Sequence, residues 1–213
     1  MKIVYFLCLA LIVSTLGCTV KQEYHFNRDM SGKTVSTIDM SLVNAFINPE
    51  DAESSELNTT FDTLDVFMDN AVNDLKLIEG LSNINWSWND EKNVIFLTYN
   101  FKNLESLNQS LSTNNYSYLT SSDNRMTPKF TKKGRKLIYE IPEIKMDTVF
   151  NDEKTKEMRS FFKYELSFIF DKPVRKLKNK NATLSDDKTQ VILETSMFDL
   201  FDKNFDRRFI IKL

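Results

Sequence analysis

Few side chains in this sequence have the types and spacing that catalysis requires. The chain contains one histidine and two cysteines, so a metal cage of His and Cys ligands cannot be assembled within it. A Ser-His-Asp triad would have to use His25, which stands between Tyr24 and Phe26, and we interpret it as an ordinary strand residue. The four glycines are far apart, so the sequence has no Gly-rich phosphate loop.

Carboxylates are the remaining candidates for catalysis, because the chain has 30 of them and acid–base pairs are formed in space. Asp186 and Asp187 fall in a turn-like stretch, and Asp199 and Asp202 flank a short helical one, so we interpret all four as structural residues. The sequence therefore predicts that the protein is not an enzyme and holds no cofactor and no metal. A hydrolase that depends on carboxylates is the least favoured alternative.

Cys18 has the clearest chemical assignment. A basic residue is followed by the uncharged stretch 3–13 and by small residues up to the cysteine, which is the layout of an export signal. The sequence Leu16-Gly17-Cys18 resembles the lipobox of bacterial lipoproteins, in which the cysteine after the cleavage site is acylated. The resemblance implies a signal peptide over 1–17 and a lipid such as palmitate on Cys18, with residues 18–22 forming the lipidated end and a short tether.

Acylation would decide where the protein is found. Cleavage would remove Cys8, so the mature chain would have one cysteine and no disulfide. Two or more acyl chains hold a protein durably on a membrane. Because Thr19 rather than Asp follows Cys18, the retention rule of enteric inner membranes would not apply. We expect a location on the cell membrane or outer membrane, anchored by lipid and facing the periplasm or the surface.

Basic residues form two clusters. The first consists of Lys129, Lys132, Lys133, Arg135 and Lys136, and the second of Lys172, Arg175, Lys176, Lys178 and Lys180. Such clusters are commonly solvated turns and charged strand edges that prevent edge-to-edge pairing. The functional interpretation is contact with anionic lipid headgroups or surface glycans. We expect that contact, if it is made, at Lys132, Lys133, Arg135, Arg175 and Lys176.

Aromatic residues offer a second kind of surface. Trp86 and Trp88 alternate with polar residues on one predicted strand, where they could stack on a sugar. The favoured interpretation is that they pack beneath a helix predicted over 59–78, whose apolar residues recur at helical spacing. The acidic residues of that helix, including Asp65 and Asp69, are interpreted as its solvated face.

The elements that position these residues are hairpins separated by single helices. Alternating and helical patterns predict a hairpin over 24–42, the helix over 59–78, a hairpin over 84–101, a short helix over 103–111, a hairpin over 129–141, a helix over 152–162 and strands over 164–170, 174–178, 191–195 and 207–211. Residues 113–127 are expected to form an exposed loop. In the first hairpin, the turn over 29–32 is expected to have a positive φ at Gly32.

This order predicts an α+β fold with an antiparallel sheet built from hairpins and with helices packed on one face. Residues 23–213 show no change of composition that would mark a second domain, so we expect a single domain after a cleaved signal. The 28 basic and 30 acidic residues give a net charge of −2, which argues against a nucleic-acid partner.

Three stretches carry a family resemblance. They are the hairpin segment 26–40, the return strand and helix start over 99–108, and the late segment 179–191. The pattern resembles uncharacterised lipoproteins of the Bacteroidetes type, and it is distantly similar to the mycobacterial LppM-type lipoprotein domain. The shared residues serve turns and packing, so the resemblance implies a fold and an envelope location, with lipid or glycolipid contact as a hint, and it implies no catalytic positions.

The sequence therefore predicts a membrane-anchored lipoprotein that acts as a non-enzymatic binding or accessory module of the cell envelope. Its partners would be the membrane, through the lipid on Cys18, and an envelope protein or lipid. The alternative is a lipoprotein that binds a lipid or glycolipid in an apolar pocket. A deep cavity between sheet and helices would favour this alternative, and a filled interior would favour the binding module.

Overall fold

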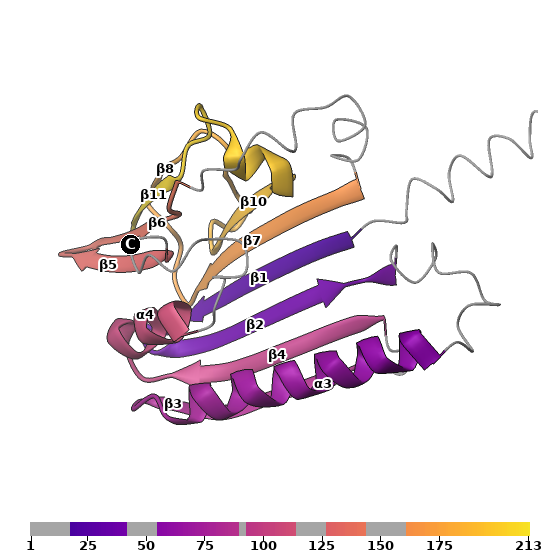
Figure 1. The fold of residues 1–213 in the computed structure, drawn as a ribbon. Helices are drawn as coiled ribbons and strands as arrows, with labels where there is room; N and C mark the ends of the chain where they lie inside the picture. Colours follow the sequence, from indigo (N-terminus) through magenta and orange to yellow (C-terminus); the bar gives the residue numbers. More distant parts are fainter. Residues whose placement is uncertain (1–17, 42–54, 90–92, 114–126, 144–160) are drawn as a thin grey trace, which may run out of the picture.

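The structure is a computed structural model that describes residues 18–41, 55–89, 93–113, 127–143 and 161–213, without the side chains of residues 55–63. The described residues form two sheets, two α-helices and a short 3-10 helix (Figure 1). The predicted helix over 152–162 and the predicted loop over 113–127 lie almost entirely outside the described residues. Among the described residues, no helix has the length and hydrophobicity that crossing a membrane demands.

The larger sheet has seven strands in the order β3-β4-β2-β1-β7-β10-β9. Their bounds are β1 Cys18–Phe26, β2 Gly32–Asp39, β3 Leu81–Trp88, β4 Val94–Phe101, β7 Phe162–Phe170, β9 Thr183–Leu184 and β10 Gln190–Ser196. Two of the three predicted hairpins lie in this sheet and are confirmed as β1–β2 and β3–β4, and β2 pairs with β4 to join them. The α+β class is therefore confirmed.

The pairing of β1 with β7 is parallel, whereas we expected an antiparallel sheet throughout. Cys18 lies opposite Phe162, and Phe26 lies opposite Phe170. A parallel pair needs a long crossover connection, and here everything from β2 to β6 separates the two strands in the chain. The sheet is therefore mixed at its centre.

The smaller sheet has four antiparallel strands in the order β5-β6-β11-β8. Its strands are β5 Lys129–Lys133, β6 Lys136–Glu140, β8 Lys176–Lys178 and β11 Arg208–Lys212, and the short helix η5 Met197–Phe201 precedes the last of them. Phe130, Tyr139 and Phe209 point from this sheet into the core, and all three are at most 1% exposed.

Aromatic rings join the two sheets. Phe168 of β7 lies 5.8 Å from Phe130, 5.2 Å from Tyr139 and 5.4 Å from Phe209, measured between ring centroids. Tyr24 of β1 stacks on Phe168 at 5.8 Å and meets Phe130 edge-on at 4.9 Å. These offset and edge-to-face arrangements are the geometries that aromatic pairs prefer. The core between the sheets is therefore a continuous aromatic cluster.

The helix α3 (Ser55–Lys76) covers the β3 and β4 side of the same face (Figure 1). Its buried residues Met68, Val72 and Leu75 pack into the core. The Trp86 indole N–H donates to Asp69 Oδ1 at 2.8 Å, and the Trp88 indole donates to Asp65 Oδ1 at 2.7 Å. The tryptophans thus lie beneath the helix as expected, but Asp65 and Asp69 are hydrogen-bond partners rather than a purely solvated face.

The second helix, α4 (Leu104–Thr113), connects the two sheets. Asn103 caps it as expected, because its side chain accepts a hydrogen bond from the Ser106 backbone N–H at 2.9 Å. Asn108 binds the backbone of Phe130 in β5 through both ends of its amide, at 2.8 and 2.7 Å. This helix therefore fixes the edge of the small sheet to the rest of the domain.

Two expectations about the first hairpin and the residues that lead into it are wrong. Residues 18–22 were expected to form a tether, but residues 19–22 pair with a strand on each side, Cys18 pairs with Phe162 of β7, and Gln22 is only 3% exposed. The positive φ of the first turn belongs to Met30, at 72°, and not to Gly32. Gly32 is needed for space, because a Cβ there would stand 1.8 Å from the His25 carbonyl oxygen.

Candidate functional site

The β5–β6 hairpin carries the first basic cluster. Gly134 and Arg135 form its two-residue turn, and Gly134 has a φ of +59°. A type II′ hairpin turn needs a positive φ at its first central residue, which explains the glycine. The sequence pattern predicts a turn over 132–135, but the turn is shorter, so Lys132 and Lys133 belong to β5, and Lys136 starts β6.

A row of lysines crosses the outer face of the small sheet. Lys133 of β5 pairs with Lys136 of β6, which pairs with Lys212 of β11, which pairs with Lys176 of β8. We call Lys133, Lys136, Lys212 and Lys176 the lysine row. All four side chains are exposed. Adjacent strands are about 4.8 Å apart, so the row places four ammonium groups along roughly 15 Å of surface.

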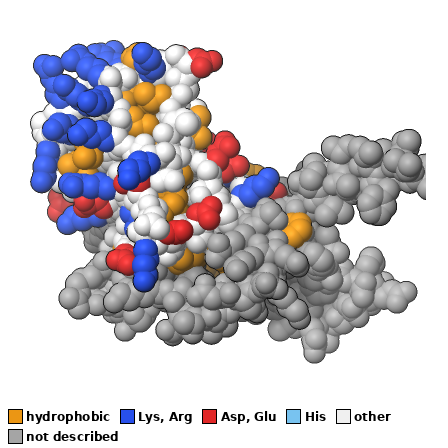
Figure 2. All heavy atoms as spheres, turned by 90° about the horizontal axis from the view of Figure 1, so that it is seen from above, with side chains coloured by type: hydrophobic (Ala, Val, Ile, Leu, Met, Phe, Trp, Pro, Cys, Tyr) orange, Lys and Arg blue, Asp and Glu red, His pale blue; other side chains and the backbone are white. Residues whose placement is uncertain are grey.

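The next positions on the same face have two apolar residues at their centre, Ile138 and Ile210. Thr131, Ile138, Ile210 and Lys178 form the neighbouring cross-strand row. Beyond it lie Lys129, Glu140 and Arg208, where Arg208 Nε binds Glu140 Oε1 at 2.9 Å. Figure 2 shows the blue basic side chains gathered with orange apolar ones on this part of the molecule. The face thus combines a cationic row with an apolar strip.

The structure brings only some of the predicted contact residues into this row. Lys133 and Lys176 belong to it. Arg135 and Arg175 are exposed near its two ends, where Arg135 follows Gly134 in the turn and Arg175 directly precedes β8. Lys132 alternates to the other side of β5 and pairs with Leu137. The pKa of Asp29 is lowered first by hydrogen bonds from Ser31, and the positive charge of Lys132 adds to this lowering.

Sequence reasoning missed Lys212 completely and did not single out Lys136 as a contact residue. β11 lies between β6 and β8, although they are distant in the sequence, and this order aligns the two clusters. The only local signal was that two basic residues, Arg208 and Lys212, stand at the two ends of a short apolar stretch.

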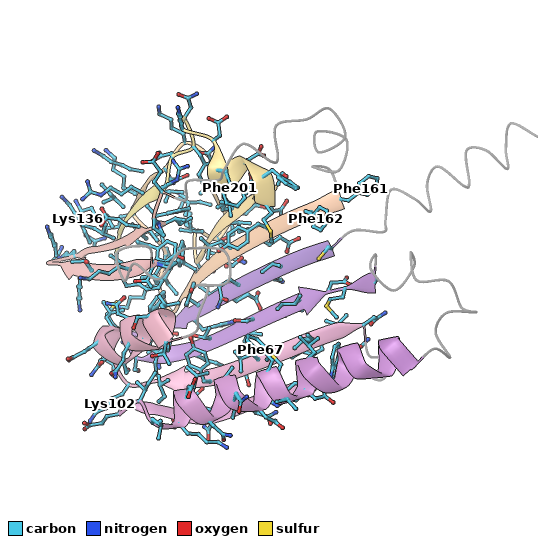
Figure 3. The ribbon with its side chains drawn as sticks, in the orientation of Figure 1. Phe67, Lys102, Lys136, Phe161, Phe162 and Phe201 are labelled. Atoms are coloured by element: carbon cyan, nitrogen blue, oxygen red, sulfur yellow. The ribbon has the colours of Figure 1, made fainter. Side chains whose placement is uncertain are left out.

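The lysine row and Cys18 lie at opposite ends of the domain. Leu213, which follows Lys212, lines a pocket with Phe26 and Phe170, the last residues of β1 and β7. Cys18 and Phe162 are the first residues of the same two strands. Figure 3 shows Lys136 and Phe162 at the two ends. The 9 residues of β1 therefore separate the ends by roughly 26 Å, at about 3.3 Å per residue.

The pocket at this far end has a volume of about 190 Å³. Phe26, Met30, Phe170 and Leu213 supply its apolar walls, and Arg28 and Lys172 bring positive charge. It is smaller than the roughly 300–1,000 Å³ of typical ligand sites. It also lies at the ends of two strands rather than between the sheet and its helices. A shallow pocket of this kind could hold a small group and not a lipid chain.

Cys18 begins β1 at the other end. Its thiol is half-buried, and burial followed by the negative charge of Asp39 raises its pKa above 9.0. The thiolate is the nucleophilic form, so a raised pKa lowers the fraction of thiolate at neutral pH. The geometry thus does not prepare Cys18 for catalysis.

The carboxylates singled out in the sequence serve turns and a helix cap. Asp199 accepts hydrogen bonds from the Ser196 backbone N–H and from the Thr195 hydroxyl, and it completes a capping box with Ser196. The Ser31 hydroxyl, at 2.7 Å, lowers the pKa of Asp29. Among the described residues, no group of three or more His, Cys, Asp or Glu residues is arranged to hold a metal ion.

Asp187 gives a pH-dependent prediction. The Ser185 hydroxyl, followed by the backbone and hydroxyl of Thr189, lowers the pKa of Asp187 from 3.8 to about 2. Because the folded pKa is the lower one, the stabilisation is complete above pH 3.8 and is lost as the pH falls towards 2. We expect Asp187→Asn to be less stable than the wild type at pH 7 and the difference to shrink at pH 2. Urea unfolding at several pH values measures this, and a constant difference would contradict it.

Comparisons with known proteins add one structural similarity. No protein-family profile and no curated protein matches the sequence. Among solved structures, the chain is similar to the NMR structure of the folded domain of the Mycobacterium tuberculosis LppM protein. The identity is 10%, the similarity covers 92% of this chain and 90% of that chain, and the TM-score is 0.42. This is a likeness in chain arrangement alone, and the Bacteroidetes-type assignment stays a prediction.

Proposed function

We propose that the chain is a lipid-anchored module of the bacterial cell envelope, acylated on Cys18, that works by binding a partner and not by catalysis. The observation that carries the proposal is the placement of Cys18 at the start of β1, directly after an export-signal pattern, with an exposed cationic face at the other end of the same strands. The anchor and the contact surface then occupy separate parts of one domain.

An acyl group on Cys18 would place one end of the large sheet at the membrane. Residues 19–22 are paired within the sheet, so no flexible spacer would separate the lipid from the folded domain. The start of β7 and the end of β2 lie beside Cys18 and would share this position. Several acyl chains would make the attachment durable. The membrane is that of the cell or the outer membrane, and the domain faces the periplasm or the surface.

The interior supports binding at a surface over binding in a cavity. The space between the sheets is occupied by the Tyr24 and Phe168 cluster, and the space beneath α3 is occupied by Trp86 and Trp88. The described pocket is small and lies outside these layers. A lipid or glycolipid carrier is therefore the less supported alternative.

The anchor is tested by comparing the two cysteines of the chain. We expect Cys18→Ala to abolish labelling by radioactive palmitate and to block processing to the smaller mature form. It should also alter the share of the protein that sediments with the membrane fraction. Cys8→Ala is the matched control, because Cys8 would leave with the signal peptide. It should leave both labelling and processing unchanged. Continued labelling and an unchanged size of the Cys18→Ala chain would overturn the proposal.

A further inference from the structure

The lysine row is an unfavourable arrangement for an isolated sheet. Like charges placed directly opposite each other on neighbouring strands destabilise the pairing. Within the described part of the chain, none of the four lysines makes an ion pair, whereas Arg208 on the same face is paired with Glu140. An anionic ligand lying across the strands would remove the repulsion and gain four favourable interactions at once.

We propose that the outer face of the small sheet binds an extended acidic polysaccharide, whose carboxylates lie along the lysine row. The row runs across the strands at about 4.8 Å per step, so it presents a regular line of charge to a linear polymer. A polymer of uronic acids carries one carboxylate on each sugar and can follow such a line. Lysine supplies mobile point charges, which tolerate a repeating ligand without a fixed bidentate geometry.

The strip beside the row suits a sugar ring. Ile210 is half-buried between Ile138 and Lys178, so it offers a recessed apolar surface next to the charges. The C–H groups of a pyranose ring could lie on it while the carboxylate reaches the lysines. The outward positions of β5, β6, β11 and β8, which are all described, hold no aromatic residue. Single-stranded nucleic acids bind through stacking on aromatic side chains, so they fit this face poorly.

The choice of a polysaccharide over the anchoring membrane rests on the proposed function. If Cys18 is acylated, the lysine row stands roughly 26 Å from the lipid attachment, as reckoned along β1 at about 3.3 Å per residue. Electrostatic attraction to a charged surface is screened within about 8 Å at physiological ionic strength. The row would therefore face away from its own membrane, towards polymers outside it.

Binding of the full chain to immobilised polygalacturonate tests the proposal, with neutral dextran as the reference polymer. The protein is kept in a non-ionic detergent, and the measurement is made at several salt concentrations. We expect Lys136→Gln combined with Lys212→Gln to weaken binding roughly tenfold or more and to make the salt dependence shallower. The matched control is Lys102→Gln combined with Lys163→Gln, which removes the same charge at exposed positions directly after β4 and in β7 of the large sheet. It should bind almost as the wild type does.

Two further measurements separate the possible outcomes. Urea unfolding of the Lys136 and Lys212 double variant should show unchanged or higher stability, because repulsion is relieved. The Cys18→Ala chain should still bind polygalacturonate, so failure of the anchor and failure of this inference can be told apart. Absence of wild-type binding, equal weakening in the control, or displacement by phosphatidylglycerol micelles at the same charge concentration would each overturn the inference.

Discussion

Phe168→Ala should lower the free energy of unfolding by about 3–5 kcal/mol, as expected for removal of a fully buried aromatic ring. Phe168 is 0% exposed, and its ring contacts strands of both sheets. Its removal would open a cavity where β7 meets the small sheet. Because those contacts align the small sheet on the domain, the loss should also loosen the strands that carry the lysine row.

Urea unfolding followed by the fluorescence of Trp86 and Trp88 measures this loss. Leu77→Ala is the control, because Leu77, directly after α3, is 84% exposed and loses little burial on truncation. We expect the control to change stability by about 1 kcal/mol or less. Similar losses in the two variants would show that the aromatic cluster does not hold the sheets together.

Hairpins were predictable because their information is local. The alternation over 94–101 placed Ile95, Leu97, Tyr99 and Phe101 on one face, and all four are buried. A short turn fixes which strands pair, so β1–β2, β3–β4 and β5–β6 follow from adjacent residues. The helix caps and the packing of the tryptophans beneath α3 depend on similarly short patterns.

Pairings between distant strands could not be predicted in the same way. The parallel contact of β1 with β7 and the insertion of β11 between β6 and β8 depend on which apolar faces meet in the core. Phe168, Phe209 and Phe130 decide this through packing, and no turn connects them.

The candidate site shows the same limit. Each basic cluster was visible in the sequence, but their alignment is a property of the sheet order. Lys133 and Lys136 are neighbours through a turn, whereas Lys212 and Lys176 join them only through long-range pairing. The charge itself was therefore predictable, and the regular row was not.

Gly32→Ala should be among the most damaging substitutions of a single small residue in this chain. A Cβ at Gly32 would meet the His25 carbonyl oxygen at 1.8 Å and the Phe101 ring at 2.7 Å. The first of these atoms belongs to the backbone of β1, so the hairpin would have to separate or the strand would have to shift. Either change disturbs the pairing of β2 with both β1 and β4. We expect a loss of about 3 kcal/mol or more in the free energy of unfolding.

Gly134→Ala separates this steric effect from the general cost of replacing a glycine. Gly134 has a positive φ of 59°, but a Cβ there meets nothing within 4 Å. Its replacement should cost only the strain of a left-handed backbone, about 1–2 kcal/mol. Urea unfolding of both variants should therefore place Gly32→Ala well below Gly134→Ala in stability. The opposite order would mean that glycine is required in this fold mainly for its backbone conformation, and not for the close contact of β1, β2 and β4.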